Sequence, residues 1–284
     1  MANKVREFEF TDKDFQKIRD LAQAQAGIFL SPKKRDLVYS RIARRLRALG
    51  LFTFEDYLDY LAGHADEAQD FINALTTNLT AFFREKHHFA MLAEQMLQID
   101  ARNSNSSKKP IKIWSSACST GEEAYSLAIT AVETFGSWTP PVRILATDVD
   151  TNVLAQAKKG IYASDRISKL GAERIKTFFV KGKGSHLGMV RVRPQLQQLI
   201  QFNSLNLLAP SWPIRGPVDA IFCRNVMIYF DKSTQYKVLE RFHPLLGQQG
   251  LLYAGHSESF HHAADLFRLR GKTVFYPVTS STGV

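Results

Sequence analysis

The feature that most constrains the fold is a change of hydrophobic period near residue 111. Before that point apolar residues recur at helical spacing, whereas beyond it short apolar runs alternate with helical patterns. The runs are IKIW (111–114), VRILAT (142–147), VDAIFC (218–223) and LLYAGH (251–256). Apolar strands that are separated by helices predict a parallel sheet covered by helices on both faces. The chain is therefore expected to be an α/β protein with an all-helical region in front of the sheet.

Local composition divides the chain into three parts. Residues 1–99 are expected to form a helical N-terminal domain, and the polar stretch 100–110 (DARNSNSSKKP) has the composition of a linker. Residues 111–284 are expected to form the sheet domain, with a small antiparallel β-subdomain at about 182–203, where short strand-like runs break the alternation. Capping signals bound the first two helices: Thr11 with Asp14 and Gly27 for one, Ser31-Pro32 and Gly50 for the other.

Composition and charge indicate the cellular setting. The chain has 284 residues, of which 45% are hydrophobic and 23% charged, as is typical of soluble globular proteins. No apolar run approaches the roughly 20 residues that cross a bilayer, and the N-terminus MANKVREFEF lacks a signal-peptide core. Two cysteines, Cys118 and Cys223, favour a reducing compartment. We expect a cytoplasmic protein, monomeric by default and without membrane insertion, whose net charge of +10 favours an acidic partner.

The loop SSACSTGEEAYS (115–126) lies where nucleotide-binding folds place a glycine-rich turn. It has one glycine, Gly121, and the next two residues, Glu122 and Glu123, would repel a pyrophosphate. Asp148, at the end of the second predicted strand, can accept hydrogen bonds from two ribose hydroxyls. S-adenosylmethionine has an adenosine without phosphate, and its sulfonium and ammonium groups suit nearby acids. The loop therefore favours S-adenosylmethionine over NAD or ATP. Alternatively, the two glutamates only complement a helix dipole.

Six motifs occur in an order that resembles a known family. They are NLTAFFREKHHF (78–89), STGEEAYS (119–126), ATDVD (146–150), NLL (206–208), CRNVMIYF (223–230) and GLLYAGHSESF (250–260). Together they resemble the chemotaxis receptor methyltransferases, the CheR family. The resemblance implies transfer of methyl groups from S-adenosylmethionine to chemoreceptor glutamates. It also implies a helical N-terminal domain joined to a Rossmann-like domain with a small β-subdomain. One departure is Ala124, where the family pattern has proline, which should alter loop rigidity more than chemistry.

The resemblance also implies a set of cofactor contacts. These are Asn78, Thr80, Arg84, one acid of the pair Glu122 and Glu123, Asp148, Asn206, Leu207, Asn225 and Val226. The sequence leaves open which acid of the pair makes the contact. Asn206 and Asn225 follow or end apolar segments at the expected carboxyl edge of the sheet, where α/β proteins bind ligands. No metal is expected, because the histidines form adjacent pairs (87–88 and 261–262) and not i, i+4 ligand pairs.

Methyl transfer to a glutamate needs little acid–base help, because the acceptor carboxylate is already ionised at pH 7. Catalysis instead requires in-line placement of oxygen, methyl and sulfur, with water excluded. The resemblance points to Arg84 and Tyr229 as the residues at that place. We hypothesise that Arg84 orients the substrate carboxylate and that the Tyr229 hydroxyl positions the carboxylate or the methyl group. Alternatively, Tyr229 is a buried turn residue and Arg84 forms a structural salt bridge.

Basic residues gather in SPKKRDLVYSRIARRLRALG (31–50). The candidate docking residues for acidic cytoplasmic helices of a chemoreceptor are Lys34, Arg41, Arg44, Arg45 and Arg47. Such a contact should be fast and sensitive to salt. The alternative is a solvated basic face. Nucleic acid would also fit the charge, but the aromatic interleaving typical of its binding sites is absent here.

The predicted β-subdomain offers a second candidate docking site. In GKGSHLGMVRVR (182–193) the glycines permit close backbone approach and the arginines suit an acidic peptide or a terminal carboxylate. We expect a C-terminal receptor peptide to add as a strand here, with Gly188, Arg191 and Arg193 in contact with it. The alternative is an edge strand that arginines protect from pairing.

Two other functions would explain part of these patterns. A methyltransferase that acts on nucleic acid would account for the charge, and a non-catalytic cofactor-binding adaptor would keep the fold without turnover. The presence of Arg84, Asp148 and Tyr229 argues against the adaptor, because these are the residues expected to bind the cofactor and to place the acceptor for turnover.

Overall fold

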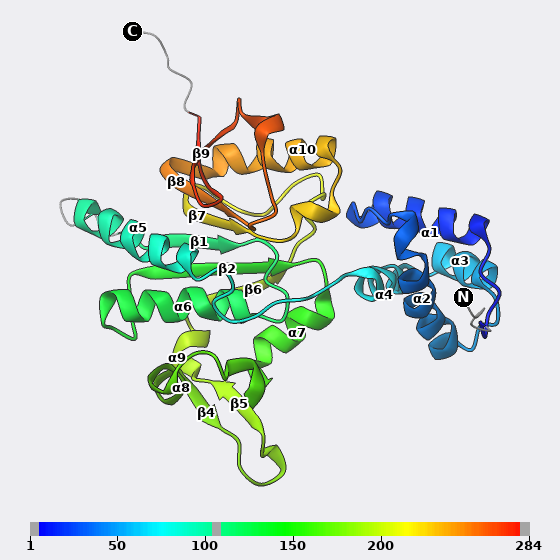
Figure 1. Cartoon of the computed structure of the whole chain (residues 1–284), viewed down its shortest axis with the longest axis horizontal. Coiled ribbons are helices and arrows are strands. Elements are labelled where there is room, and N and C mark those ends of the chain that lie inside the picture. Colours follow the sequence, from blue (N-terminus) through cyan, green and yellow to red (C-terminus); the bar gives the residue numbers. More distant parts are fainter. Residues whose placement is uncertain (1–5, 104–108, 279–284) are drawn as a thin grey trace.

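The computed structural model describes residues 6–103 and 109–278, which form a helical domain and a sheet domain side by side (Figure 1). The helical domain consists of α1 (Asp12–Ala26), α2 (Arg35–Leu49), α3 (Phe54–Gly63) and α4 (Ala65–Leu75), with a 3-10 turn, η1 (Pro32–Lys34), before α2. The buried faces of these helices share one hydrophobic core, which extends from Phe8 to Leu75. The all-helical N-terminal domain expected from the sequence is confirmed.

The predicted bounds of the first helix and the predicted end of the second are confirmed, but Pro32 opens the 3-10 turn and α2 itself begins at Arg35. The Thr11 hydroxyl accepts the N–H of Asp14 (3.1 Å), and the Asp14 carboxylate accepts the N–H of Thr11 (2.9 Å), which together make a capping box. Gly27 and Gly50 follow the ends of α1 and α2 with φ of 66° and 69°, a backbone conformation that favours glycine. Gly27 has a second constraint, because a Cβ there would lie 2.3 Å from Cδ1 of Leu208 in the sheet domain.

The sheet domain is built on seven strands in the order β6-β2-β1-β7-β8-β10-β9. Their bounds are β1 (Ile111–Ser115), β2 (Val142–Asp148), β6 (Ile200–Ser204), β7 (Val218–Cys223), β8 (Leu246–Ala254), β9 (Phe267–Gly271) and β10 (Val274–Pro277). The five strands from β6 to β8 are parallel, and β10 pairs antiparallel with both β8 and β9. The four predicted strands are β1, β2, β7 and β8, so the predicted parallel sheet is confirmed.

Helices cover both faces of this sheet. They are α5 (His87–Asn103), α6 (Glu122–Phe135), α7 (Thr151–Lys159), α9 (Pro194–Gln197) and α10 (Lys232–Phe242), whereas α8 (Ala172–Phe178) lies beside the strand Phe179–Lys181, outside this sheet. Because strand side chains alternate, Ile113 and Phe222 pack into a core shared with α5 and α6, whereas Trp114 and Ile221 pack into a core shared with α10. None of the helices within residues 6–103 and 109–278 combines the length and hydropathy of a membrane span.

The boundary between the two domains lies near residue 76, so the predicted helical domain (1–99) and linker (100–110) are wrong at that boundary. Helix α5 belongs to the sheet domain, because Phe89, Leu92 and Met96 pack into the core that α6 and β1 share. Residues 100–103 complete α5, and 104–108 lie outside the described residues. The chain passes between the domains through residues 76–86, which we call the interdomain segment. The polar stretch therefore begins inside a helix of the sheet domain.

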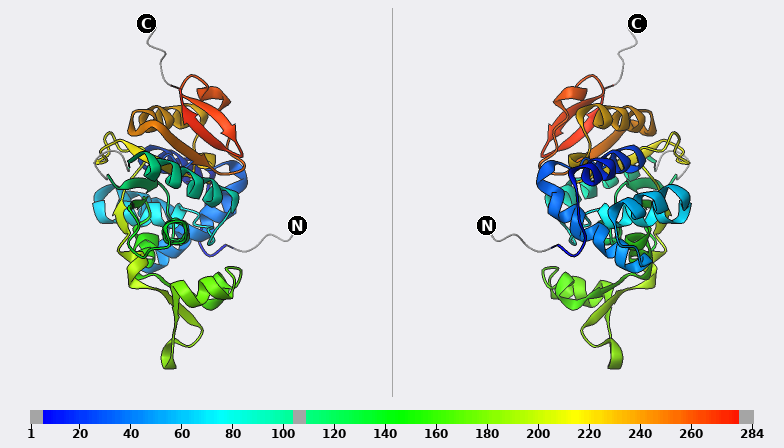
Figure 2. Two further views of the ribbon diagram at one scale, coloured as in Figure 1. Left: turned by 90° about the vertical axis from the view of Figure 1, so that its left-hand side faces the viewer. Right: turned by 90° about the vertical axis from the view of Figure 1, so that its right-hand side faces the viewer.

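The small antiparallel sheet is present, but the range predicted for it, 182–203, is wrong. The sheet consists of β3 (Ile161–Ala163), β4 (Phe179–Lys181) and β5 (Met189–Val192) in the order β3-β5-β4. Strand β6 pairs in parallel with β2 and belongs to the large sheet. The small sheet projects away from the large one in all three ribbon views (Figures 1 and 2). Strand-like residues alone did not indicate that the pairing partner changes between β5 and β6.

The helical domain is held by three loops that follow strands of the large sheet. The hydrogen bonds are, in the order β2, β6 and β7, Gln69 Nε2–H to the carbonyl of Val149 (2.9 Å), Asn206 Nδ2–H to the carbonyl of Gln25 (2.7 Å), and the N–H of Phe29 to the carbonyl of Tyr229 (3.0 Å). Because these strands are parallel, their carboxyl ends meet at one edge of the sheet. The helical domain therefore covers the edge at which α/β proteins bind ligands.

Within the helical domain, the buried carboxylate of Glu67 depends on Arg45. Glu67 accepts hydrogen bonds from Arg45 Nε (2.9 Å) and from the hydroxyl of Tyr57 (2.8 Å), and its side chain is 4% exposed. Arg45→Ala should lower the free energy of unfolding by about 2–3 kcal/mol, because it leaves a buried charge without its cation. Urea denaturation monitored by circular dichroism would measure the change.

A matched control for this prediction is Arg47→Ala. Arg47 pairs with Glu7, and about half of each side chain is exposed, so solvent already screens the pair. Loss of Arg47 should leave the free energy of unfolding unchanged within error. Equal destabilisation by the two substitutions would contradict the role given to the Arg45–Glu67 pair.

Candidate functional site

A cavity lies at the junction of the two domains and is lined by both. Most of the predicted cofactor and catalytic residues line it together: Asn78, Thr80, Arg84, Glu123, Asp148, Asn206, Leu207, Asn225, Val226 and Tyr229. These residues come from the interdomain segment, the start of α6 and the loops after β2, β6 and β7. The fold thus brings five separate parts of the chain to one place. Glu122 is the predicted cofactor residue that does not line the cavity.

Asp148 ends β2 at the floor of this cavity. Its carboxylate accepts the N–H of Ser119 (2.8 Å) in the β1–α6 loop and the N–H of Asp150 (3.0 Å). Burial raises the pKa of Asp148 to about 6, although these backbone donors favour the ionised form. The side chain is therefore fixed in direction, and the carboxylate oxygens have lone pairs left for further donors.

The single glycine of the β1–α6 loop is required by close packing. Gly121 has a φ of 98°, and a Cβ there would lie 2.9 Å from the Cβ of Ala157 and 2.9 Å from the hydroxyl of Tyr162. Its place directly before α6 allows the loop to turn tightly under the cavity. The loop therefore needs one glycine for its fold and not the three of a pyrophosphate-binding turn.

The two adjacent acids of α6 have different partners. Glu123 lines the cavity and accepts hydrogen bonds from the hydroxyl of Ser115 (2.7 Å) and from Arg224 (3.0 Å). Burial raises the pKa of Glu123, and Arg224 opposes this rise. Glu122 instead accepts hydrogen bonds from Arg166 and from the hydroxyl of Thr120 (2.6 Å). The prediction of Glu122 as a cofactor residue is therefore not supported by its position, and Glu123 is the acid that faces the cavity.

Arg224 is a central residue of the site that the sequence did not single out. Its guanidinium donates to Glu123 and to the carbonyl of Arg84, and lies 3.2 Å from the carboxylate of Glu85. Although burial opposes it, the Arg224 charge lowers the pKa of Glu85 to about 2. The motif CRNVMIYF contains this arginine, but a buried arginine cannot be told from an exposed one without the fold. Arg224 joins the end of β7, the start of α6 and the interdomain segment.

The interdomain segment is anchored to the sheet domain at several points. Asp150 accepts hydrogen bonds from the hydroxyl of Thr76 (2.6 Å) and from the side-chain amide of Asn78 (2.8 Å). The hydroxyl of Ser119 donates to the carbonyl of Asn78 (3.1 Å), and Arg166 donates to the carbonyl of Thr80 (3.0 Å). Asp150 therefore holds Asn78 in place, although a role was predicted only for Asp148 of the ATDVD motif.

The turn after β7 is held by Glu258, a second residue without a predicted role. Its buried carboxylate accepts the N–H groups of Asn225 (3.0 Å), Met227 (2.8 Å) and Gly255 (2.5 Å). Asn225 has a φ of 59°, and its amide lies so close to Gly255 that a Cβ there would be 2.3 Å from Asn225 Nδ2. Glu258 thus stabilises a turn in which Asn225 has a left-handed backbone conformation that residues with a side chain rarely adopt. This turn places Asn225 and Tyr229 at the cavity.

The two predicted catalytic residues line the same cavity, Arg84 from the interdomain segment and Tyr229 from the loop after β7. Tyr229 ends the 3-10 turn η4 (Met227–Tyr229), and the ammonium of Lys34 lies 5.1 Å from the centre of its ring. Arg84 donates to the carbonyl of Leu79 (3.0 Å), which folds the guanidinium back over the interdomain segment. Lys34 is therefore part of the cavity wall, although it was predicted as a docking residue.

Three of the predicted docking arginines of α2 use their side chains within the protein. Arg41 donates to the carbonyl of Leu75 (2.7 Å) at the end of α4, Arg45 to Glu67, and Arg47 to Glu7 (3.0 Å). Arg44 is exposed. A docking role of α2 therefore concerns Arg44 first, because the guanidinium groups of Arg41, Arg45 and Arg47 already have partners within the helical domain.

The predicted docking residues of the small sheet lie differently from expectation. Strand β5, which contains Arg191, is the central strand, so it has no free edge for strand addition. Arg193 donates to the carbonyl of Thr177 (2.8 Å), and the carbonyl of Gly188 accepts the N–H of Ser164 (2.8 Å). The edges of this sheet are β3 and β4. The expectation that a peptide adds as a strand to a free edge within 182–193 is therefore not met, because β5, the strand in this range, is paired on both sides.

One group of possible metal ligands occurs among the described residues. Glu85, His87 and His88 can bring one atom each within 4.8 Å of one another. Glu85 already lies 3.2 Å from the guanidinium of Arg224, and His88 Nε2 lies 2.8 Å from the carbonyl of Lys272. The positive charge of Arg224 would repel a metal ion at this position. Glu85 and His88 are therefore interpreted as parts of an ion-pair and hydrogen-bond cluster around Arg224.

Comparison with known proteins gives a consistent result over both domains. A family model described as the all-alpha domain of CheR methyltransferase matches residues 13–76, and one described as the S-adenosylmethionine-binding domain of CheR methyltransferase matches residues 78–276. The chain is 50% identical over 272 residues to chemotaxis protein methyltransferase 2 of Pseudomonas aeruginosa, which covers 96% of this chain and 95% of the relative. It is 48% identical over 267 residues to the chemotaxis protein methyltransferase of Escherichia coli, with 93% and 91% covered.

The pKa of Asp148 predicts how cofactor binding depends on pH. We expect ribose hydroxyls to donate to an ionised Asp148, but burial raises the pKa of this carboxyl from 3.8 to about 6, so the free protein takes up a proton between pH 7 and pH 5. The Kd for S-adenosylhomocysteine should therefore rise by about tenfold from pH 7 to pH 5, as calorimetric titration would show. Asp148→Asn should bind more weakly at pH 7 with a Kd that no longer changes over this range. A constant Kd in the unsubstituted protein would contradict the prediction.

Proposed function

Because the chain belongs to the CheR family of chemotaxis protein methyltransferases, we propose how its own residues perform the family's reaction. The chain transfers the methyl group of S-adenosylmethionine to glutamate side chains of chemoreceptors. The observation that most supports the proposal is that Glu123, Asp148 and Tyr229, from three separate segments, line one cavity under the helical domain.

The residues at the cavity fit S-adenosylmethionine. Asp148 offers a buried carboxylate to the ribose hydroxyls, and Glu123 offers a second one to the ammonium group. The side chain of Asn206 already donates to the carbonyl of Gln25 and accepts the N–H of Leu208 (2.9 Å), so we propose that its backbone faces the cofactor. Leu207 is buried at the cavity wall and supplies an apolar surface for the adenine.

We propose that the remaining predicted residues complete this binding site. Asn78 and Thr80 contribute from the interdomain segment, and Asn225 with Val226 from the turn that Glu258 holds. Arg84 lines the cavity, and we propose that it contacts the cofactor and also orients the substrate carboxylate, the two roles expected from the sequence. All five depend on the anchoring of their segments by Asp150, Arg224 and Glu258, which the hydrogen bonds above describe.

Bound S-adenosylmethionine supplies an electrophilic methyl group on a sulfonium, so the chain itself needs no acid, base or metal for the chemical step. The acceptor carboxylate forms the new O–C bond while the C–S bond breaks, and no proton is transferred. We propose that Arg84 directs the acceptor carboxylate and that the Tyr229 hydroxyl holds it in line with the methyl group. Ile28, Leu30 and Leu207 line the cavity and limit the access of water.

Chemoreceptors are the substrates of this family, and we propose two contacts for them. Acidic receptor segments would approach Lys34 and Arg44 on the helical domain, in the cytoplasm. A C-terminal receptor peptide would add to an edge of the small sheet at β3 or β4, in place of the predicted β5. Val180 in β4 is about half exposed. A strand added beside β4 would cover this apolar side chain.

The roles of Arg84 and Tyr229 are tested by separating binding from turnover. Tyr229→Phe and Arg84→Ala should each lower kcat for receptor methylation by about a hundredfold, because a misplaced acceptor loses in-line geometry. Tyr229→Phe should leave the Kd for S-adenosylhomocysteine within about twofold. Unchanged turnover in both variants, with cofactor binding intact, would defeat the hypothesis.

The acceptor is tested by transfer of labelled methyl groups from S-adenosylmethionine to a chemoreceptor cytoplasmic fragment. Label should appear on the intact fragment and not on one whose target glutamates are replaced by alanine. A third fragment without its C-terminal tail should be methylated with a higher KM if the small sheet binds that tail. Label that persists on the alanine fragment would point to another acceptor.

A further inference from the structure

Three large apolar side chains are exposed in segments that line the cavity. Phe29 is 49% exposed, Ile228 52% and Leu79 78%. Leu79 itself lines the cavity, the N–H of Phe29 donates to the carbonyl of Tyr229 (3.0 Å), and Ile228 precedes Tyr229 in η4. We call Phe29, Leu79 and Ile228 the apolar rim.

Their gathering distinguishes these side chains from other exposed apolar residues. Phe52, in the turn between α2 and α3, and Leu269, in the edge strand β9, are also exposed, and single residues of this kind are ordinary on protein surfaces. The apolar rim instead comes from three separate segments that converge on one cavity. Apolar residues gathered in this way, with polar groups around them, mark a surface that another molecule covers.

The length of the acceptor side chain limits what can cover this surface. A fully extended glutamate places its carboxylate roughly 5 Å from its own Cα. A protein glutamate therefore enters the cavity only if its backbone comes close to the mouth. The residues next to the target glutamate must then contact the apolar rim.

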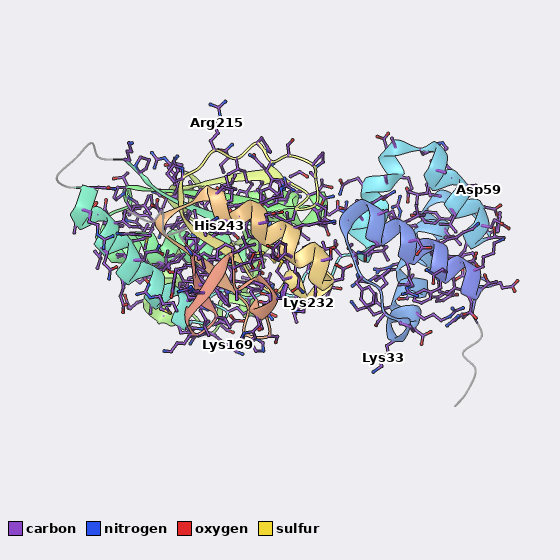
Figure 3. The ribbon with its side chains drawn as sticks, turned by 90° about the horizontal axis from the view of Figure 1, so that it is seen from above. Lys33, Asp59, Lys169, Arg215, Lys232 and His243 are labelled. Atoms are coloured by element: carbon purple, nitrogen blue, oxygen red, sulfur yellow. The ribbon has the colours of Figure 1, made fainter. Side chains whose placement is uncertain are left out.

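Cations border the same mouth. The ammonium of Lys34 lies 5.1 Å from the centre of the Tyr229 ring, and Arg84 donates to the carbonyl of Leu79. Figure 3 shows Lys33 and Lys232 at the surface of the two domains, on either side of their junction. These charges attract an acidic segment, but they do not select among its glutamates, because long-range attraction acts on the whole segment.

We infer that the apolar rim is a docking surface for a receptor segment in which apolar side chains flank the target glutamate. The inference rests on the proposed function and adds to it the feature that selects the acceptor. Every surface glutamate offers the same carboxylate, whereas only some have apolar neighbours that fit the rim. Seating these neighbours also removes water from the mouth of the cavity, as transfer of a methyl group to an anion requires.

The experiment uses the full chain with Phe29→Ser and Ile228→Ser combined, assayed on a chemoreceptor cytoplasmic fragment. The KM for the fragment should rise by about tenfold, because two apolar contacts with the receptor are lost. The kcat and the Kd for S-adenosylhomocysteine should stay within about twofold, since neither Phe29 nor Ile228 lines the cavity. Phe29→Leu with Ile228→Leu should keep the KM near its original value.

Matched controls remove exposed apolar side chains elsewhere. Phe52→Ser and Leu269→Ser should each leave the KM unchanged. A reciprocal change replaces the apolar residues beside the target glutamate of the receptor fragment by serine. It should raise the KM of the unsubstituted chain and add little to that of the double variant, because both changes remove the same contact.

Three outcomes would overturn the inference: an unchanged KM in the double variant, an equal rise in the Leu269→Ser control, or a parallel loss of S-adenosylhomocysteine binding. The third would show that the rim supports the fold of the cavity instead of contacting the receptor. If the unsubstituted chain transferred no methyl to the fragment while it bound the cofactor, the proposed function itself would fail and the inference with it.

Discussion

The buried guanidinium of Arg224 is the interaction on which the site depends most. It stands between the carboxylates of Glu123 and Glu85 and also binds the carbonyl of Arg84. A buried charge is tolerated only where opposite charges and hydrogen bonds compensate its loss of hydration. Because its partners belong to α6 and to the interdomain segment, this compensation exists only when both are in place. The electrostatics of one residue therefore link the cofactor loop to the segment that contains Arg84.

The contrast between Glu122 and Glu123 shows how adjacent residues acquire different functions. Neighbouring positions on a helix point about 100° apart, so two successive acids can face different surroundings. Glu123 faces the cavity and Arg224, whereas Glu122 faces Arg166, from the turn that follows β3. Arg166 also binds the carbonyl of Thr80. The small sheet is thus connected through one arginine to the cofactor loop and to the interdomain segment.

The sequence predicted the large features because they depend on local pattern. The parallel strands, the capped helices and the residues at the strand ends follow from hydrophobic period and from turn chemistry, and the family resemblance supplied most residues of the cavity. The errors concern partners that are distant in sequence. Helix α5 has the same pattern whether it packs on α4 or on the sheet, and β6 has the same pattern in either sheet. Arg224 and Glu258 act through hydrogen bonds to backbone groups, and Asp150 through hydrogen bonds from the side chains of Thr76 and Asn78, which no spacing reveals.

The attachment of the helical domain has a mechanical consequence. Val149, Asn206 and Tyr229 lie in three different loops; each loop holds the helical domain by a hydrogen bond, and each residue lines the cavity. Three attachment points that do not lie on one line fix the orientation of a rigid domain on a surface. A change in the length of any one loop would therefore tilt the whole helical domain, and every distance across the cavity would change with it.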